Sequence, residues 1–482
     1  MVFIDSVIYS IIGNINHVKL FLSMINNKRF QNHGFWYYIG ELIRKYDSNG
    51  LSFWIDQTEK ALEGKELPLF INTSIKNTCE KIWMLRPISD DLPKLNIVTL
   101  AFYAREDNPE KYNKWHNQWI NNTFQIKCKK SEYIMHFIYR LHWLDFAHSD
   151  DKWYKFIDGL WVIIDANNID LKTNIPNVIL NSSEIEFNSR KPSSFPEFDD
   201  LLSTKYKYYH YLFWGCYIDE IKDTYDKLYV LNGVLERIPN SLNHFSYNIS
   251  FRDYTPGDFI SKPIGINYEH NLSHINDCLI LLRKLFTNDT SFNDFMNIIS
   301  LSLFGYNGVC LLKSQTQQSI DLIISLLTNI YGEYFIHNPK IYHHYKGQSF
   351  NPDKHNIIRG NRILFYNNFI QQKHLSNLVS NRKYCFYDPI LKWTQINSTI
   401  FLSYSDKITI KGHDNNINFE KYPELNKLCL IELGGNLDIN DITPDKITQL
   451  SQALFWLMID NYRKIHDKKV QFTPINLDDI IV

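Results

Sequence analysis

A short apolar run followed at once by a helical pattern constrains this chain most. Residues 309–312 (VCLL) form a buried-strand candidate, and apolar side chains recur at helical spacing over residues 320–330. Two further strand candidates, residues 362–366 and 399–402, lie downstream with helical or polar segments between them. This alternation predicts an α/β layer, and a strand, loop and helix in succession is the layout of a phosphate-binding unit.

The composition supports a folded, aromatic-rich protein of several domains. The chain has 482 residues, of which 44% are hydrophobic and 15% aromatic. At about 150 residues per domain this length predicts two to four domains with a sizeable core. Basic and acidic residues nearly cancel, giving a net charge of -1, so the chain is not a general polybasic binder of nucleic acid.

The first part of the chain is predicted to be helical. Apolar side chains follow helical spacing over residues 18–43 and again over 134–161, so we expect helices to about residue 165. Strand and turn chemistry then appears at residues 228–233 and 251–258. The expected fold is mixed α/β and predominantly helical. The predicted parts are a helical region (1–225), a small β-containing connector (226–270), an α/β module (271–425) and a C-terminal helical cap (426–482).

The cysteines and the N-terminus indicate a reducing compartment. Seven cysteines lie far apart with no C-x-x-C pair, which supports neither a zinc site nor a disulfide framework. The first residues carry no basic leader, and no apolar run approaches the ~18 residues of a membrane span. We therefore expect a protein that is not secreted, has no membrane partner and binds no metal.

Several landmarks in the chain resemble the poxvirus-type primase-helicases of large DNA viruses. They occur in the family's order and spacing: DKWYKF (151–156), LNGV (231–234), FR (251–252), PGDFIS (256–261) and GINY (265–268). Further agreement comes from FWYYIG (35–40), GLSFW (50–54), GEYF (332–335) and ALFWL (453–457). The resemblance covers most of the chain but not the family's primase region. It implies a helical region, then a superfamily-3 helicase module of the AAA+ class with a P-loop, and a small C-terminal helical cap.

The phosphate-binding loop of this family is altered here. Members carry G-x-x-x-x-G-K-[ST], in which backbone amides hold the phosphates and the lysine reaches the terminal ones. In the equivalent segment, Gln317, Gln318 and Ser319 stand where glycine, lysine and serine are expected, with Thr316 just before them. Glutamine carries no positive charge, and a side chain at the glycine position obstructs the approach of the backbone to phosphate. The resemblance thus implies a degenerate P-loop.

The other catalytic positions are altered as well. The family's acidic strand end holds magnesium, whereas residues 362–366 end here in Asn367 and Asn368. The third strand is not followed by the expected sensor asparagine, and no arginine finger follows. We therefore predict no catalytic residue, no metal and no nucleotide cofactor, so that Lys313, Ser314 and the positions above are vestiges of a nucleotide pocket.

Other interpretations stay open. A second register of the loop would use Lys313 and Ser314, and the chain would then be an active ATPase and DNA helicase that needs ATP and Mg²⁺. Gln317 and Gln318 are equally compatible with an ordinary helix start capped by Thr316 or Ser314. Asn367 and Asn368 fit an ordinary strand-end turn.

The resemblance implies a function in the handling of a viral genome. The expected protein is a non-catalytic, superfamily-3 helicase-like scaffold or accessory in DNA replication or genome packaging. Its expected partners are DNA or an intact viral helicase, and its expected location is the host cytoplasm, a viral factory or the virion. Oligomerisation stays open, but loss of the nucleotide ligands argues against the family's hexameric ring. A structural protein without a nucleic-acid role is the other alternative. Basic clusters at residues 127–130, 382–383, 463–464 and 468–469 are the positions that could contact phosphates.

Overall fold

The structure is a computed structural model of the chain. It describes residues 14–71, 74–85, 96–121, 140, 142–149, 152–164, 227–239, 247–258, 260–261, 263–269, 274–305, 308–337, 363–367, 369–371, 399–404, 409–411, 429–434 and 442–465. The chain divides into two compact units. The first comprises Met1–Ile221, Asn240–His244 and Asp253–Ser261, and the second comprises Lys222–Pro239, Phe245–Arg252 and Lys262–Val482.

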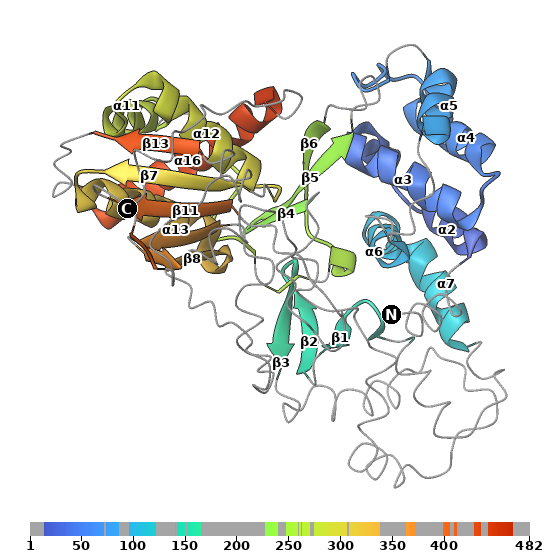
Figure 1. The fold of residues 1–482 in the computed structure, drawn as a ribbon. Coiled ribbons are helices and arrows are strands. Elements are labelled where there is room, and N and C mark those ends of the chain that lie inside the picture. Colours follow the sequence, from blue (N-terminus) through green and yellow to red (C-terminus); the bar gives the residue numbers. More distant parts are fainter. Residues whose placement is uncertain are drawn as a thin grey trace, which may run out of the picture. The chain divides into compact units, whose positions relative to one another are not determined.

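Helices dominate the first unit, as its apolar spacing predicts (Figure 1). They are α2 (Ile15–Leu22), the 3-10 turn η1 (Asn27–Gln31), α3 (His33–Tyr46), α4 (Leu51–Leu62), α5 (Ile75–Leu85), α6 (Ile97–Asp107) and α7 (Pro109–Asn121). Asparagine side chains begin α2, α3 and α6 by accepting a hydrogen bond from a backbone amide in the first turn: Asn14 for α2, Asn32 for α3 and Asn96 for α6. Trp36 and Trp54 are fully buried between these helices, with ring centroids 5.1 Å apart.

The prediction of helix up to residue 165 is wrong for residues 146–164. These residues form an antiparallel sheet of β1 (Phe146–Ser149), β2 (Lys152–Ile157) and β3 (Leu160–Ile164), in that order. The turn between β2 and β3 is Asp158 and Gly159, whose φ angles are +49° and +90°. Positive φ at both central residues matches the right-handed twist of a hairpin, which is why an Asp-Gly pair is a strong hairpin signal. The aromatic residues taken for a helical stripe instead lie opposite one another, as Phe156 and Trp161 do.

The second unit begins with the β-containing segment predicted from the sequence. Strands β4 (Lys227–Val230), β5 (Gly233–Pro239) and β6 (Tyr247–Arg252) pair antiparallel in that order. The turn between β4 and β5 contains Asn232, whose side chain exchanges hydrogen bonds with the backbone of Tyr268 at 2.8 Å and 3.1 Å. The 3-10 turn η6 (Pro256–Asp258) belongs to the first unit.

A five-stranded parallel sheet forms the centre of the second unit. Its order is β13-β7-β11-β9-β8, and every neighbouring pair is parallel. The strands are β7 (Val309–Ser314), β8 (Phe335–His337), β9 (Ile363–Asn367), β11 (Thr399–Tyr404) and β13 (Cys429–Leu433). Two short strands, β10 (Phe369–Gln371) and β12 (Thr409–Lys411), pair with each other. The strands predicted near residues 309, 362 and 399 are confirmed and lie side by side.

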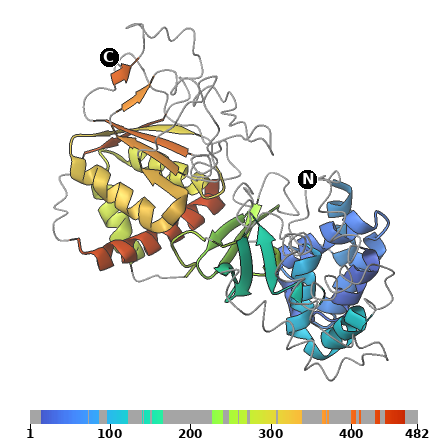
Figure 2. The same ribbon diagram turned by 90° about the horizontal axis from the view of Figure 1, so that it is seen from below.

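Helices pack against this sheet and complete the core. They are α11 (Ile275–Leu285), α12 (Asp289–Ser302), α13 (Gln317–Tyr331) with the 3-10 turn η7 (Gly332–Tyr334), and α16 (Pro444–Ile465), gathered on one side of the sheet in Figure 2. One hydrophobic core joins β7, β9, β11 and β13 to the buried faces of these helices. The mixed α/β fold predicted from the sequence is confirmed.

The C-terminal part differs from the prediction at one point. Residues 426–482 were expected to form a helical cap alone, but Cys429–Leu433 form β13, an edge strand of the parallel sheet. The helix α16 buries Leu454, Phe455 and Met458 in the same core as that sheet. The segment therefore contributes both a strand and a covering helix to the module. Residues 429–433 form the strand because buried and less buried side chains alternate along them at period 2.

Candidate functional site

The candidate site lies at the carboxyl end of β7. From β7 the chain crosses through α13 to β8 at one edge of the sheet, whereas from β11 it passes to β13 at the other edge. The connections of these two neighbouring strands thus leave in opposite directions. In open α/β sheets such a switch point is where ligands bind, outside the carboxyl ends of the strands. We refer to residues 313–319, which lie there, as the β7–α13 junction.

The β7–α13 junction is short and held by its own hydroxyl groups. Strand β7 ends at Ser314 and α13 begins at Gln317, so two residues, Gln315 and Thr316, connect them. The Ser314 hydroxyl donates to the Thr316 carbonyl oxygen at 2.8 Å and accepts from the Thr316 amide at 3.3 Å. Ser314 itself is 5% exposed. The turn is therefore closed on itself by a buried side chain.

The first turn of α13 uses its polar side chains within the helix. The hydroxyls of Thr316 and Ser319 lie 2.8 Å apart in a hydrogen bond, and Ser319 is 1% exposed. Gln317 donates its side-chain amide to Asp321 at 2.8 Å. Gln317 and Gln318 are exposed. This first turn thus carries neutral side chains and a nearby carboxylate, whose charge repels phosphate.

Lys313 lies within β7 and not in a loop. Its direct cross-strand neighbours are Glu432 on β13 and Tyr404 on β11. The Lys313 Nζ lies 3.4 Å from Glu432 Oε1, and the two side chains are 44% and 38% exposed, so water screens the pair. Tyr404 is buried, and burial together with the charge of Glu432 raises the pKa of its hydroxyl. Because successive residues of a strand point to opposite faces, Lys313 and Ser314 face opposite sides of the sheet.

The remaining predicted positions are only partly described. Asn367 is the last residue of β9 and the cross-strand partner of Ser403 on β11. On its other side, Ser403 pairs with Leu312 on β7. The carboxyl ends of β7, β11 and β9 therefore lie at one edge of the sheet. Asn368 lies outside the described residues. Of the lysines that follow the third strand, Lys407, Lys421 and Lys427 also lie outside the described residues, and Lys411 is the last residue of β12.

The basic clusters are also described in part. Only Arg463 and Lys464, at the end of α16, lie within the described residues. Lys464 pairs with Asp460 at 2.5 Å, and Arg463 donates to the Tyr268 hydroxyl at 3.4 Å. The clusters at residues 127–130, 382–383 and 468–469 lie outside those ranges, as does the tail beyond residue 465.

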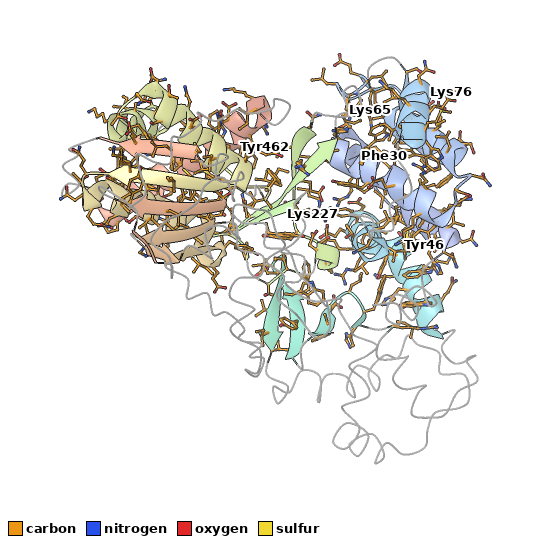
Figure 3. All side chains as sticks on the ribbon, viewed as in Figure 1. Phe30, Tyr46, Lys65, Lys76, Lys227 and Tyr462 are labelled. Atoms are coloured by element: carbon orange, nitrogen blue, oxygen red, sulfur yellow. The ribbon has the colours of Figure 1, made fainter. Side chains whose placement is uncertain are left out.

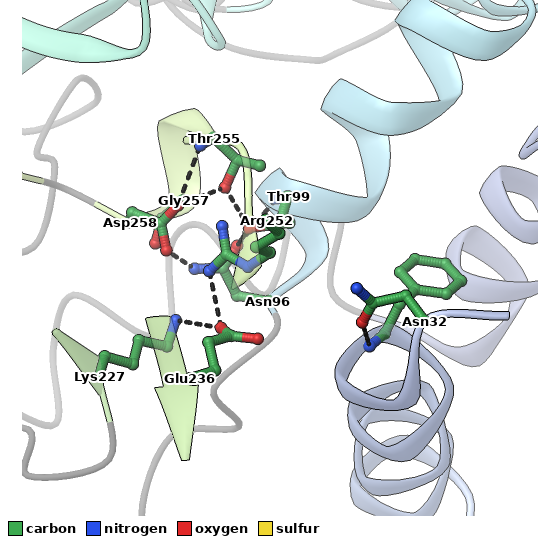
Figure 4. Close-up of polar contacts among 10 residues, drawn as sticks. Asn32, Asn96, Thr99, Lys227, Glu236, Arg252, Thr255, Gly257 and Asp258 are labelled. Atoms are coloured by element: carbon green, nitrogen blue, oxygen red, sulfur yellow. Dashed lines mark hydrogen bonds and ion pairs between the residues drawn. The ribbon is translucent and has the colours of Figure 1, made fainter. Parts of the chain in front are cut away.

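Sequence reasoning missed a buried polar network in the first unit. The segment TPGD (255–258) packs against the start of α6, where Asn96 donates to the Gly257 carbonyl oxygen at 3.0 Å (Figure 4). The hydroxyls of Thr99 and Thr255 lie 3.0 Å apart, and Asp258 accepts from the amide of Thr255 at 2.9 Å. All three are at most 2% exposed. The landmark PGDFIS thus begins with a structural turn.

A buried ionic cluster in the second unit was missed as well. Lys227 on β4 (Figure 3) and Arg252 on β6 flank Glu236 on β5 (Figure 4). Glu236 Oε1 lies 3.5 Å from Lys227 Nζ and 2.8 Å from Arg252 Nη2. The exposed fraction is 4% for Lys227 and 2% for Glu236. A strand that is buried on both faces has no exposed side for a charged residue. A charged residue within such a strand, as Glu236 is in β5, therefore indicates a buried ion pair.

Two searches of the described residues bear on metals and membranes. They contain no group of three or more histidine, cysteine or acidic residues placed to hold a metal ion. Within the same parts of the chain, every helix is too short or too polar to cross a lipid bilayer.

Comparison with known proteins gives limited likeness. Neither protein-family models nor curated protein sequences match the chain. Among solved structures, the apo A form of the NrS-1 C-terminal region (305-718) matches with a TM-score of 0.28 and 15% identity, over 38% of this chain and 44% of that one. A second structure of this C-terminal region matches with a TM-score of 0.26 and 15% identity, over 41% and 46% of the two chains. The chain thus spans less than half the length of these structures, and a likeness of this size assigns it no activity.

Proposed function

We propose that this chain is a non-catalytic relative of the superfamily-3 helicases and acts as a scaffold or accessory in viral DNA replication or genome packaging. The proposal rests on the family landmarks in the sequence and on one structural observation. That observation is the two-residue connection of β7 to α13, in which the Ser314 hydroxyl forms hydrogen bonds with both the amide and the carbonyl oxygen of Thr316.

A phosphate loop needs free backbone amides and room. The motif G-x-x-x-x-G-K-[ST] wraps a nucleotide's phosphates with amides that glycine leaves accessible, and its lysine neutralises their charge. Here Gln315 and Thr316 are the whole connection, and the Thr316 amide already bonds to Ser314. These features support a module that keeps the fold and has given up nucleotide hydrolysis. Core packing and site chemistry depend on different residues, so a fold can outlast its activity.

The competing proposal is an ATPase that uses Lys313 and Ser314. Lys313 retains its charge at the end of β7, and its side chain is 44% exposed. Against this use, Lys313 pairs with Glu432, and Ser314 is buried and turned to the other face of the sheet. A turnover assay with ATP and Mg²⁺ separates the two proposals. Magnesium-dependent hydrolysis that disappears in Lys313→Ala would support the ATPase, and no hydrolysis above background is expected.

The proposed partners are DNA or an intact helicase of the same virus. The net charge of -1 predicts that any contact with DNA is local and depends strongly on salt. Gel shifts with single-stranded and duplex DNA at low salt, repeated at physiological salt, test the DNA contact. Light scattering with and without a co-expressed intact helicase tests the protein contact. A chain that binds neither would be a structural protein outside replication.

A further inference from the structure

Two of the seven cysteines, 119 positions apart, are direct cross-strand partners. Cys310 on β7 and Cys429 on β13 face each other in the parallel register of the sheet. Neighbouring strands lie about 4.8 Å apart. This spacing falls inside the range of roughly 4.4–6.8 Å that disulfides span between Cα atoms. The pairing is a property of the fold, because nothing in the cysteine spacing indicates it.

Both side chains point into the same part of the core. Register partners on adjacent strands project to the same face of a sheet, and both cysteines belong to the hydrophobic core shared with the helices. Cys310 is fully buried and Cys429 is 2% exposed. Both are reduced, as are the other described cysteines, Cys79 and Cys278.

The strand that carries Cys429 has hydrogen bonds outside the sheet near its carboxyl end. Among the described strands it lies at the edge of the sheet, beside β7. Near that end, the backbone carbonyl oxygen of Glu432 accepts from the Thr287 amide at 3.1 Å, and the Glu432 amide donates to the Ser291 hydroxyl at 3.2 Å. Leu433 forms an isolated β-bridge with Phe286. Cys429 is the first residue of the strand, away from these anchors. Local opening of this edge strand would give a small-molecule oxidant access to Cys429.

We propose that Cys310 and Cys429 form a redox-responsive dithiol that joins β13 covalently to β7 when it is oxidised. The oxidant we propose is a small-molecule disulfide such as oxidised glutathione. The Cys429 thiolate attacks this disulfide, releases one reduced glutathione and forms a mixed disulfide. The Cys310 thiolate then displaces the second glutathione. In total, two protein thiols lose two electrons and two protons, one disulfide is formed, and two molecules of reduced glutathione are released.

Oxidation would couple the two ends of the module. Strand β7 leads into α13, and β13 precedes α16, so the bond would close the chain between them into one loop. Cross-linking so long a loop stabilises the folded state chiefly by restricting the unfolded chain. Burial raises the pKa of the Cys310 thiol, so the reaction is expected to be slow and limited by the opening of β13.

The test uses the full chain incubated with oxidised glutathione over a time course. Remaining thiols are then alkylated under denaturing conditions, and the protein is digested without reduction for mass spectrometry. The expected result is one cross-linked peptide pair that contains Cys310 and Cys429, reversible by dithiothreitol and accompanied by a higher thermal midpoint. Stable glutathione adducts without the cross-link, preferential pairing with other cysteines, or persistence of both thiols throughout would each overturn the proposal.

A matched pair of variants checks the assignment. Cys429→Ser should abolish both the cross-link and the rise in thermal midpoint. Cys278→Ser removes another buried thiol of the same unit, one whose side chain contacts the Leu450 carbonyl oxygen, and should leave the cross-link intact. If Cys429→Ser does not fold, the peptide map of the unaltered chain decides alone.

Discussion

Lys313 and Glu432 face each other across β7 and β13, with 3.4 Å between Nζ and Oε1. Lys313 is the lysine that the alternative loop register would use to bind a nucleotide. A P-loop lysine lies beyond its strand, in the first turn of the following helix, and reaches the terminal phosphates. Lys313 instead lies inside the strand beside a carboxylate. Its pairing is consistent with a structural part in the sheet.

Replacing Lys313 by Met should therefore change little. Both partners are more than a third exposed, and a screened ion pair of this kind contributes about 0–1 kcal/mol. We expect the free energy of unfolding in urea to fall by less than about 1 kcal/mol. Glu432→Gln should give a similar value. A loss of several kcal/mol would mean that the pair is shielded from water and would contradict this account of the sheet edge.

Replacing Glu236 by Gln should be far more damaging. Glu236 is 2% exposed and contacts both Lys227 and Arg252, so the change removes the negative charge that both cations share. Breaking a buried ion pair by removing one partner costs about 3–5 kcal/mol. Urea unfolding measures the difference. Glu269→Gln, at an exposed position of the same unit, is the matched control and should lie within about 0.5 kcal/mol of the unaltered chain.

A methyl group at Gly257 should disturb the first unit. A Cβ there would overlap the Thr99 hydroxyl and stand 2.5 Å from Asn96 Oδ1, the atom that caps α6. Overpacking of this kind typically costs about 1–3 kcal/mol, so the thermal midpoint of Gly257→Ala should fall. Adding Thr99→Ala makes room for the methyl group. The double variant should lose less stability than the sum of the losses in the two single variants. Additive losses would show that the methyl group at position 257 does not clash with the Thr99 side chain.

The stability of the first unit should depend on the protonation of His33. Its ring stacks on Phe70 with centroids 4.7 Å apart, and both ring nitrogens are shielded from solvent without a hydrogen-bond partner in the structure. Burial lowers the pKa of His33 from 6.5 to about 4. The unfolded chain therefore binds a proton at a higher pH than the folded one. Stability should be complete above pH 6.5 and decline as the pH falls toward about 4.

The substitution His33→Phe keeps an aromatic ring and removes the titrating group. Urea unfolding followed from pH 7.5 to about 4.5 should show a shallower loss of stability in this variant than in the unaltered chain. A residual slope is expected, because burial also lowers the pKa of His17, His116 and His142. An unchanged slope in His33→Phe would show that this ring does not titrate in that range.

Much of the second unit could be predicted from the sequence. The runs near residues 309, 362 and 399 are apolar and lie between helical patterns, so their strand character was visible without knowledge of their partners. The order of the strands was not predicted, because pairing depends on tertiary packing. For the same reason β13 was not predicted. The segment CLIEL, residues 429–433, forms a strand by pairing with β7.

The helix prediction for residues 152–164, which form a hairpin, was wrong for a different reason. The spacing of its aromatic residues fits a helix as well as a strand. The Asp158–Gly159 pair, which is a hairpin-turn signal, distinguishes the two. At the candidate site, the sequence indicated which charges were missing around Gln317 and Gln318. It could not show that the Ser314 hydroxyl closes the turn, because that bond depends on the length of the connection, which only the structure gives.

Calorimetric titration of the full chain with ATP and Mg²⁺ tests the central claim most directly. The β7–α13 junction offers neutral side chains, a closed turn and a nearby carboxylate, so the account predicts no heat of binding up to millimolar nucleotide. Saturable binding with a stoichiometry of one, weakened when Lys313 is replaced by Ala, would contradict it.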